Sequence, residues 1–354
     1  FGLWCGAGLL AVWRHLARVL GARVSFAGAA TVPVFGLALL PLGLNWEWSS
    51  RADDYAARDW AYNVLMSVAP YGVLFTNGDN DTFPLWYLQE VEGLRRDVTV
   101  MVTGYLNTDW YARQVRDLTQ PCPVGVSARS DPTRIICQRL LESGQLPAAL
   151  AARAAHTTAP DDSILPLTDA EIADIAATPF VAEESLELRA GALKVTVPAG
   201  TVMFPADTFV AAILKATLGK RPIYFAAPHP TIDKLGLQAY TVRQGLALAL
   251  HNGNPQPSRD AGIIALPDSP LSPVTGAFVD LPLTESLLRT TFVQRGRLLE
   301  LDRPFVDFAV SNILLQYAWV HYTAAQAYAV NGSASAAEQH VRSARWWEAR
   351  TQGS

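Results

Sequence analysis

An uncharged run of 21 residues, 24–44, is the feature that most constrains this chain. A helix of this length rises about 1.5 Å per residue, enough to cross the roughly 30 Å apolar core of a bilayer. Membrane helices tolerate prolines such as Pro33 and Pro41, and Trp46 and Trp48 come next, where an interfacial aromatic belt is expected. We therefore expect a membrane-spanning helix over 24–44. The alternative is a buried hairpin of a soluble protein, in which so long an uncharged run is rare.

The residues before this run predict its orientation. Residues 1–13 are apolar but too short to span, so we expect the cut end of a preceding, truncated helix. Residues 14–23 hold Arg14, His15, Arg18 and Arg23 and no acid, which predicts a cytoplasmic loop. Residues 1–46 are then the membrane region of a multi-pass protein of the inner (plasma) membrane. Everything beyond it is expected on the periplasmic or extracellular side.

Composition limits the possibilities for the rest of the chain. The chain has 354 residues, so about 300 remain beyond the membrane region, enough for one large domain or two smaller ones. The formal charge is −4 and the basic residues are scattered, which does not predict a nucleic-acid partner. Cys122 and Cys137 are the only cysteines beyond the apolar segments. In an oxidising compartment they can form a disulfide, and two free buried cysteines are the alternative.

Two strand–turn–helix units come after an amphipathic helix over 53–68. This order predicts a parallel sheet with helical crossovers. We expect an α/β extracytoplasmic domain over 47–282, with an irregular insertion at 148–187 and a loop at 253–282. The expected strands are 72–76, 98–102 and 222–227, and the expected helices are 83–94, one from residue 110, and 207–218.

The C-terminal region, 283–354, is predicted to be helical. Periodic apolar residues indicate a long helix over 302–330, and Asn331-Gly332-Ser333 separates it from a second helix over 334–349. Interleaved small and aromatic residues resemble one tetratricopeptide-like hairpin. A plain helical hairpin that packs on the sheet domain is the alternative.

Two polar turns, 77–84 and 106–111, contain the residues best suited to bind a ligand. Each turn comes directly after a predicted parallel strand, so both belong at the carboxyl edge of one sheet, where open α/β proteins bind ligands. Clustered carboxylates and amides suit a divalent cation such as Ca²⁺ or Mg²⁺, with Asp79 and Asp81 as its ligands, or the hydroxyls of a sugar. The candidate ligand-binding residues are Asn77, Asp79, Asn80, Asp81, Asn107 and Asp109.

A structural role explains most of the same residues. Asp81 or Thr82 can cap a helix that begins at Phe83, and Pro84 suits its first turn. Gly78 supplies a tight turn. Helix capping and turn formation are therefore the competing interpretation of the acidic turns.

Two further segments are weaker candidates. His229 comes after a strand in Pro228-His229-Pro230 and can face the same sheet edge, although a lone loop histidine is more often exposed. Residues 219–222 read GKRP and lack the glycine spacing of a phosphate loop, so their basic pair is expected to complement a helix C-terminus.

Three motifs in this order resemble one family. They are LFTNGDNDTFPLWY with QEVEG within 74–93, LNTDWY at 106–111 and GKRPIYFA at 219–226. The family is a large bacterial group of multi-spanning membrane proteins, related to the animal transmembrane protein O-mannosyltransferases of the C-type glycosyltransferase superfamily.

The resemblance implies that the full-length protein transfers a sugar from a polyprenyl-phosphate donor outside the cytoplasm. The catalytic carboxylate of such enzymes lies in an early external loop that this sequence does not contain, so no catalytic residue can be named. The domain is then expected to play an accessory or acceptor-binding part, with an acceptor protein or glycan and the lipid bilayer as partners.

Two other functions stay open. One is an independent metal- or sugar-binding site on the turns of Asp79, Asp81 and Asp109. The other is a non-catalytic structural or receptor-like membrane module.

Overall fold

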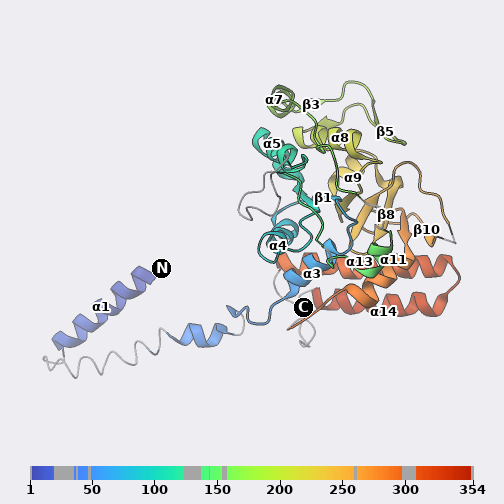
Figure 1. Cartoon of the computed structure of the whole chain (residues 1–354). Coiled ribbons are helices and arrows are strands. Elements are labelled where there is room, and N and C mark those ends of the chain that lie inside the picture. Colours follow the sequence, from blue (N-terminus) through green and yellow to red (C-terminus); the bar gives the residue numbers. More distant parts are fainter. Residues whose placement is uncertain are drawn as a thin grey trace. The chain divides into compact units, whose positions relative to one another are not determined.

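The computed structural model describes residues 2–19, 36, 39–46, 49–122, 137–142, 144–153, 158–258, 261–296 and 308–351. The chain divides into two compact units, Phe1–Asp53 and Asp54–Ser354 (Figure 1). The second unit contains both the α/β part and the C-terminal helices, which we expected as separate regions.

The first unit contains helix α1, Gly2–Val19, and a helical stretch over 39–46. Helix α1 continues through Arg14, His15 and Arg18, so the expected loop at 14–23 is wrong as far as Val19. Arg18 lies in the last turn, where a cation complements the helix dipole. Most of the expected span at 24–44 lies outside the described residues. Among the described helices, none combines the length and apolarity needed to cross a bilayer.

A seven-stranded sheet in the order β10-β11-β8-β9-β7-β1-β2 organises the second unit. β1 pairs in parallel with both β2 and β7, as expected from the strand–helix units. The sheet as a whole is mixed, because β9 runs antiparallel to both β7 and β8. The strands are β1 Val73–Thr76, β2 Thr99–Val102, β7 Ile223–Ala226, β8 Thr241–Gln244, β9 Ala247–Leu250, β10 Ile263–Ala265 and β11 Phe278–Asp280.

A two-residue turn explains the antiparallel pair. Gly245 and Leu246 connect β8 directly to β9, and so short a connection can only form a hairpin. Gly245 has φ +56°, and a Cβ there would lie 2.5 Å from the hydroxyl of Ser67. The position therefore requires glycine both for its backbone angle and for the close approach of Ser67.

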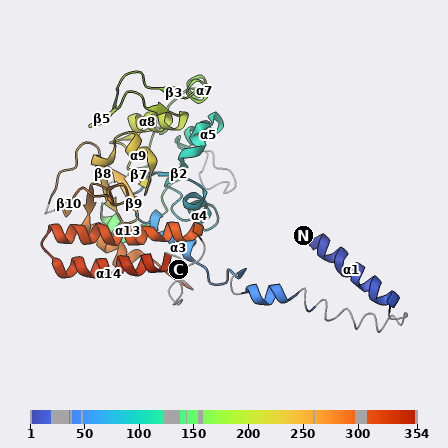
Figure 2. The same ribbon diagram turned by 180° about the vertical axis from the view of Figure 1, so that it is seen from behind.

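Helices cover both faces of the sheet, as the two views in Figures 1 and 2 show. One face packs on α3, α4 and α13 through a core that includes Trp60, Leu85 and Leu314. The other face packs on α5, α8 and α9 through a core that includes Phe75 and Phe209. These helices are α3 Ala56–Leu65, α4 Asp79–Glu90, α5 Asp109–Leu118, α8 Pro205–Thr217, α9 Pro230–Lys234 and α13 Phe308–Val330.

The described sheet ends at β2. Backbone groups on the outer side of this strand form hydrogen bonds with side chains. Thr99 N donates to Gly72 O on the β1 side, so Val100 and Val102 present their backbone groups outward. The Tyr111 hydroxyl accepts a hydrogen bond from Val102 N at 3.0 Å, and Trp86 Nε1 donates to Val100 O at 3.3 Å.

The C-terminal hairpin pairs α13 with α14, Ala334–Thr351. The rings of Tyr317 and Trp347 stack with centroids 4.5 Å apart, and Asn63 of α3 donates to the Tyr317 hydroxyl at 2.6 Å. The hairpin therefore packs on the sheet domain, as expected for a plain helical hairpin.

A polar contact also joins the hairpin to α11, Leu281–Ser286. His340 Nε2 lies 2.8 Å from Glu285 Oε1, and His340 Nδ1 lies 3.0 Å from His321 Nδ1. Burial raises the pKa of Glu285, but the neighbouring His340 and Arg289 outweigh it and lower the pKa below its ordinary value.

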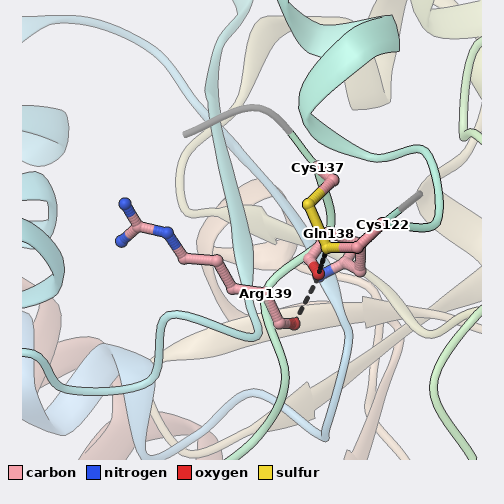
Figure 3. Close-up of a disulfide and its surroundings, with 4 residues drawn as sticks. All are labelled: Cys122, Cys137, Gln138 and Arg139. Atoms are coloured by element: carbon pink, nitrogen blue, oxygen red, sulfur yellow. Dashed lines mark hydrogen bonds between the residues drawn. A yellow bond between two sulfur atoms is a disulfide. The ribbon is translucent and has the colours of Figure 1, made fainter. Parts of the chain in front are cut away.

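Cys122 and Cys137 form a disulfide, with their Cα atoms 4.9 Å apart (Figure 3). Gln138 is the next residue and is buried, and its side chain donates to Asp97 O at 3.2 Å. The disulfide thus lies next to a buried polar contact with the loop that precedes β2.

The segment 253–282, which we expected as a loop, contains β10, α10 and β11. Pro273 stands at the start of α10, and Gly276, with φ +85°, stands at its end. The proline and the glycine therefore mark the two ends of a short helix and do not indicate a loop. The remaining elements are η1 Thr103–Asn107, α6 Ala148–Arg153, α7 Asp169–Ala177, β3 Phe180–Val181, β4 Leu186–Ala190, β5 Leu193–Val197, β6 Val202–Met203, η2 Gln238–Tyr240, α10 Ser272–Thr275 and η3 Leu287–Thr291.

Candidate functional site

Three loops meet at the carboxyl edge of β7, β1 and β2. Parallel pairing places the ends of these strands side by side, with Thr76 opposite Val102 and Phe75 opposite Phe225. The two polar turns therefore share one sheet edge, as predicted, and the loop that contains His229 joins them.

The chain leaves this edge in opposite directions. After β1 it enters α4 on one face of the sheet, whereas after β7 it enters α9 on the other face. Adjacent parallel strands whose connections diverge in this way define a topological switch point, where α/β folds open a crevice for ligands. The side chain of Asn77 crosses this point and donates to Pro228 O.

Asp81 has a structural role. Its Oδ2 accepts from Asn77 N and its Oδ1 from Gly78 N, both at 2.8 Å. These bonds satisfy backbone N–H groups at the start of α4, which begins at Asp79 rather than at the expected Phe83. Burial raises the pKa of Asp81, and the two N–H donors oppose that rise.

Asn107 also serves the local backbone. Its Nδ2 donates to Gly104 O at 3.0 Å, and its Oδ1 accepts from Ala206 N at 3.2 Å. The second bond ties the loop after β2 to the first turn of α8. Both ends of the Asn107 amide are thus occupied by protein groups.

Asp79 and Asn80 present their side chains to solvent at the start of α4. The Tyr105 hydroxyl donates to Asp79 Oδ1 at 3.3 Å and so links the loop after β2 to the loop after β1. Partial burial and the Asp79 carboxylate raise the pKa of Tyr105. Tyr105 therefore stays a neutral hydrogen-bond donor at physiological pH.

Exposed aromatic rings surround this pair. Phe83 lies one helical turn beyond Asp79 on the same face of α4 and is 49% exposed. Trp110, 56% exposed, lies beside Tyr105 with ring centroids 6.4 Å apart. Flat rings next to a carboxylate and an amide can contact a hydroxylated ligand through both its apolar and its polar atoms. We call this group the C-edge site, made of Asn77, Asp79, Asn80, Phe83, Tyr105 and Trp110.

His229 is buried at the same edge, so the expectation of an exposed loop histidine is wrong. Its Nδ1 accepts from Thr231 N at 3.3 Å, and its Nε2 lies 3.0 Å from the Thr103 hydroxyl. Burial lowers its pKa to about 4. The ring is therefore neutral at pH 7, and both nitrogens are engaged, so His229 positions the loop rather than moving protons.

The carboxylates do not assemble into a metal centre. Asp109 pairs with Arg113 at 3.1 Å, one turn along α5. No three histidine, cysteine or carboxylate side chains of the described residues come together as metal ligands. The divalent cation at Asp79 and Asp81 stays a prediction without a third ligand.

The aromatic members of the C-edge site are not predicted from sequence. In the sequence, Phe83 and Trp110 are simply apolar residues at the start of two helices. The available signal is their position: each lies within four residues of a candidate carboxylate, at the start of a helix where side chains face the sheet edge.

One family model matches residues 57–132, and its description is TMEM260-associated domain 2. The match covers the two strand–helix units and both polar turns. No curated protein and no solved structure matches the chain. The match relates this part of the chain to a domain found with TMEM260.

Proposed function

We propose that residues 54–354 form the extracytoplasmic, acceptor-binding domain of a membrane glycosyltransferase that uses a polyprenyl-phosphate sugar donor. One observation carries the proposal: the TMEM260-associated match contains the whole C-edge site, from Asn77 to Trp110. The motif resemblance to the transmembrane protein O-mannosyltransferase group supports the same class.

The C-edge site supports binding rather than bond cleavage. Asp81 caps α4, and His229 is neutral with both nitrogens engaged, so neither is a free acid or base. Asp79 and Asn80 face solvent beside exposed rings, which suits the hydroxyls and apolar faces of a glycan or a hydroxylated peptide. The transfer chemistry is assigned to the membrane part of the protein.

The disulfide supports the proposed side of the membrane. Disulfides persist in oxidising compartments such as the periplasm and the extracellular space. The Cys122–Cys137 bond fits a domain on that side, held close to the bilayer by the span proposed at 24–44.

A sugar-binding site that works without the membrane part is the second candidate. It is favoured by the exposed rings of Phe83 and Trp110 next to Asp79. The two functions differ in their dependence on the membrane part of the protein. Only an independent site is expected to bind glycans in the absence of that part.

Sugar transfer by the full-length enzyme tests the proposal. Asp79→Ala and Trp110→Ala should each raise KM for the acceptor at least about fivefold with little change in kcat, since they remove uniform binding. Asp174→Ala, an exposed carboxylate of α7, is the matched control and should leave both constants unchanged.

Unchanged KM in both variants, with correct folding and membrane insertion, would reject an acceptor-binding role. If no sugar transfer is detected for the complete protein, the structural or receptor-like module is the remaining interpretation.

A further inference from the structure

A cavity of about 460 Å³ lies at the opposite, amino-terminal edge of β7. Its floor is one face of the sheet, where register places Tyr224, Ala249 and Val242 side by side on three neighbouring strands. Its walls come from residues 218–222 and 250–256. The volume falls within the range of small-molecule sites, which are mostly apolar with a few fixed polar groups.

A buried cation forms part of the wall. Arg221 is 4% exposed, and its hydrogen bonds go to neutral oxygens: Gln138 Oε1 at 2.8 Å, Thr119 O at 3.1 Å and Asp162 O. Its Nε has no hydrogen-bond partner among the described residues. Burial lowers the pKa of Arg221 to about 10, which still leaves it charged at pH 7. A buried guanidinium without a bonded carboxylate favours an anion nearby.

Amide groups supply further donors. The Tyr224 hydroxyl donates to Gln244 Oε1 at 2.9 Å, which orients the amide and leaves Nε2 without a partner in the described structure. Asn252 Oδ1 accepts from Ala192 N at 2.6 Å, so its Nδ2 is likewise the end left for a ligand. Both side chains line the cavity. Their fixed orientations present donors rather than acceptors.

The carboxylates of Asp161 and Asp162 act on Arg221, but neither residue is part of the described lining of the cavity. Lys220 and His251 line it, and no carboxylate does so among the described lining residues. Lys220 reaches Asp162 at 2.7 Å in an exposed pair, which is weak and can give way to a ligand. In a chain with a formal charge of −4, this grouping of basic and amide donors is distinctive.

We propose that this cavity binds a small hydroxylated anion of the sugar-phosphate class. The guanidinium of Arg221 and the ammonium of Lys220 face the oxyanion. The amides of Gln244 and Asn252 meet hydroxyl oxygens, and the apolar floor lies under the ring. This site is separate from the C-edge site and does not depend on the function proposed for it.

Calorimetric titration of the full chain with glucose 1-phosphate tests the site. Glucose and inorganic phosphate, titrated separately, should each bind at least tenfold more weakly, because each lacks half of the recognised groups. Gln244→Leu should lower the affinity for glucose 1-phosphate about tenfold. Ala249→Leu should abolish binding by filling the floor without removing a polar group.

Lys215→Ala, an exposed lysine of α8 outside the cavity, is the matched control and should bind like the wild type. Thermal unfolding checks that each variant is folded. Absence of wild-type binding at millimolar ligand, or undiminished binding by both cavity variants, overturns the proposal. Equal affinity for inorganic phosphate overturns the sugar part of the assignment.

Discussion

The hydroxyl of Tyr105 donates a hydrogen bond to the carboxylate of Asp79 across 3.3 Å. Tyr105 comes after β2 and Asp79 after β1, so one contact joins the two loops that the sequence places 26 residues apart. The contact also distinguishes the roles of Asp79 and Asp81, which the sequence alone does not tell apart. Asp79 faces the neighbouring loop and solvent, whereas Asp81 serves the backbone of its own helix.

Asp81→Ala is expected to destabilise the protein by about 2 kcal/mol, because it leaves the N–H groups of Asn77 and Gly78 without their charged acceptor. Asp79→Ala should change the free energy of unfolding by less than about 0.5 kcal/mol. Urea denaturation at pH 7 measures both. Equal losses for the two variants would contradict the division of roles.

His229→Asn is expected to flatten the pH dependence of stability. The pKa of His229 is lowered to about 4, so between pH 6.5 and 4 the unfolded chain takes up a proton that the folded protein does not. Wild-type stability therefore falls as the pH drops through this window, by up to about 3 kcal/mol for this residue. Asparagine keeps an acceptor for Thr231 N but does not titrate.

Unfolding free energies measured from pH 8 to pH 4 check this prediction. A residual slope should remain in the variant, because burial also lowers the pKa of His321 to about 4. Wild-type and variant curves that stay parallel over the whole range would show that His229 does not titrate as described.

Replacing both cysteines, Cys122→Ser with Cys137→Ser, should lower the free energy of unfolding by about 3 kcal/mol. A disulfide that closes a loop of 15 residues restricts the unfolded chain by about this amount. Denaturation with and without reductant measures the effect. The wild type should lose stability on reduction, and the double variant should not respond to reductant at all.

Glu285→Gln is expected to loosen the C-terminal hairpin without unfolding the domain. The lowered pKa of Glu285 means that its contribution is present above its ordinary pKa and is lost as the pH falls through the lowered value. At pH 7 the variant lacks the charge that faces His340 across 2.8 Å. Amide exchange in α14 should therefore rise at least about threefold.

Glu338→Gln is the matched control, because Glu338 is an exposed member of a pair within α14. It should leave exchange in the hairpin unchanged. Equal protection of α14 in both variants would show that Glu285 does not hold the hairpin.

The parallel part of the fold could be predicted because the residues that indicate each strand, turn and helix lie close together in the sequence. β1 and β2 are short apolar runs, and the polar turn after β1 precedes a helix. The hairpin of β8 and β9 depends on Gly245, whose need for a left-handed angle shows only in three dimensions. Its neighbours there, such as Ser67, are distant in sequence.

The candidate site could be predicted in position but only in part in composition. The strand ends indicated that Asn77, Asp79 and Asn107 share one sheet edge, and the parallel pairing of β1 and β2 confirms this. Their individual roles depended on which backbone groups lay within reach, and the sequence does not show that Asn107 meets Ala206. Likewise, the burial of His229 depends on packing against Phe225.

The side chains along the outer strand β2 also have a consequence for the behaviour of the protein at high concentration. A strand with free backbone groups at the end of a sheet recruits strands from other molecules and so starts aggregation. Here Tyr111 and Trp86 already occupy Val102 N and Val100 O. The chain thus carries its own protection against edge-to-edge polymerisation on this side of the sheet.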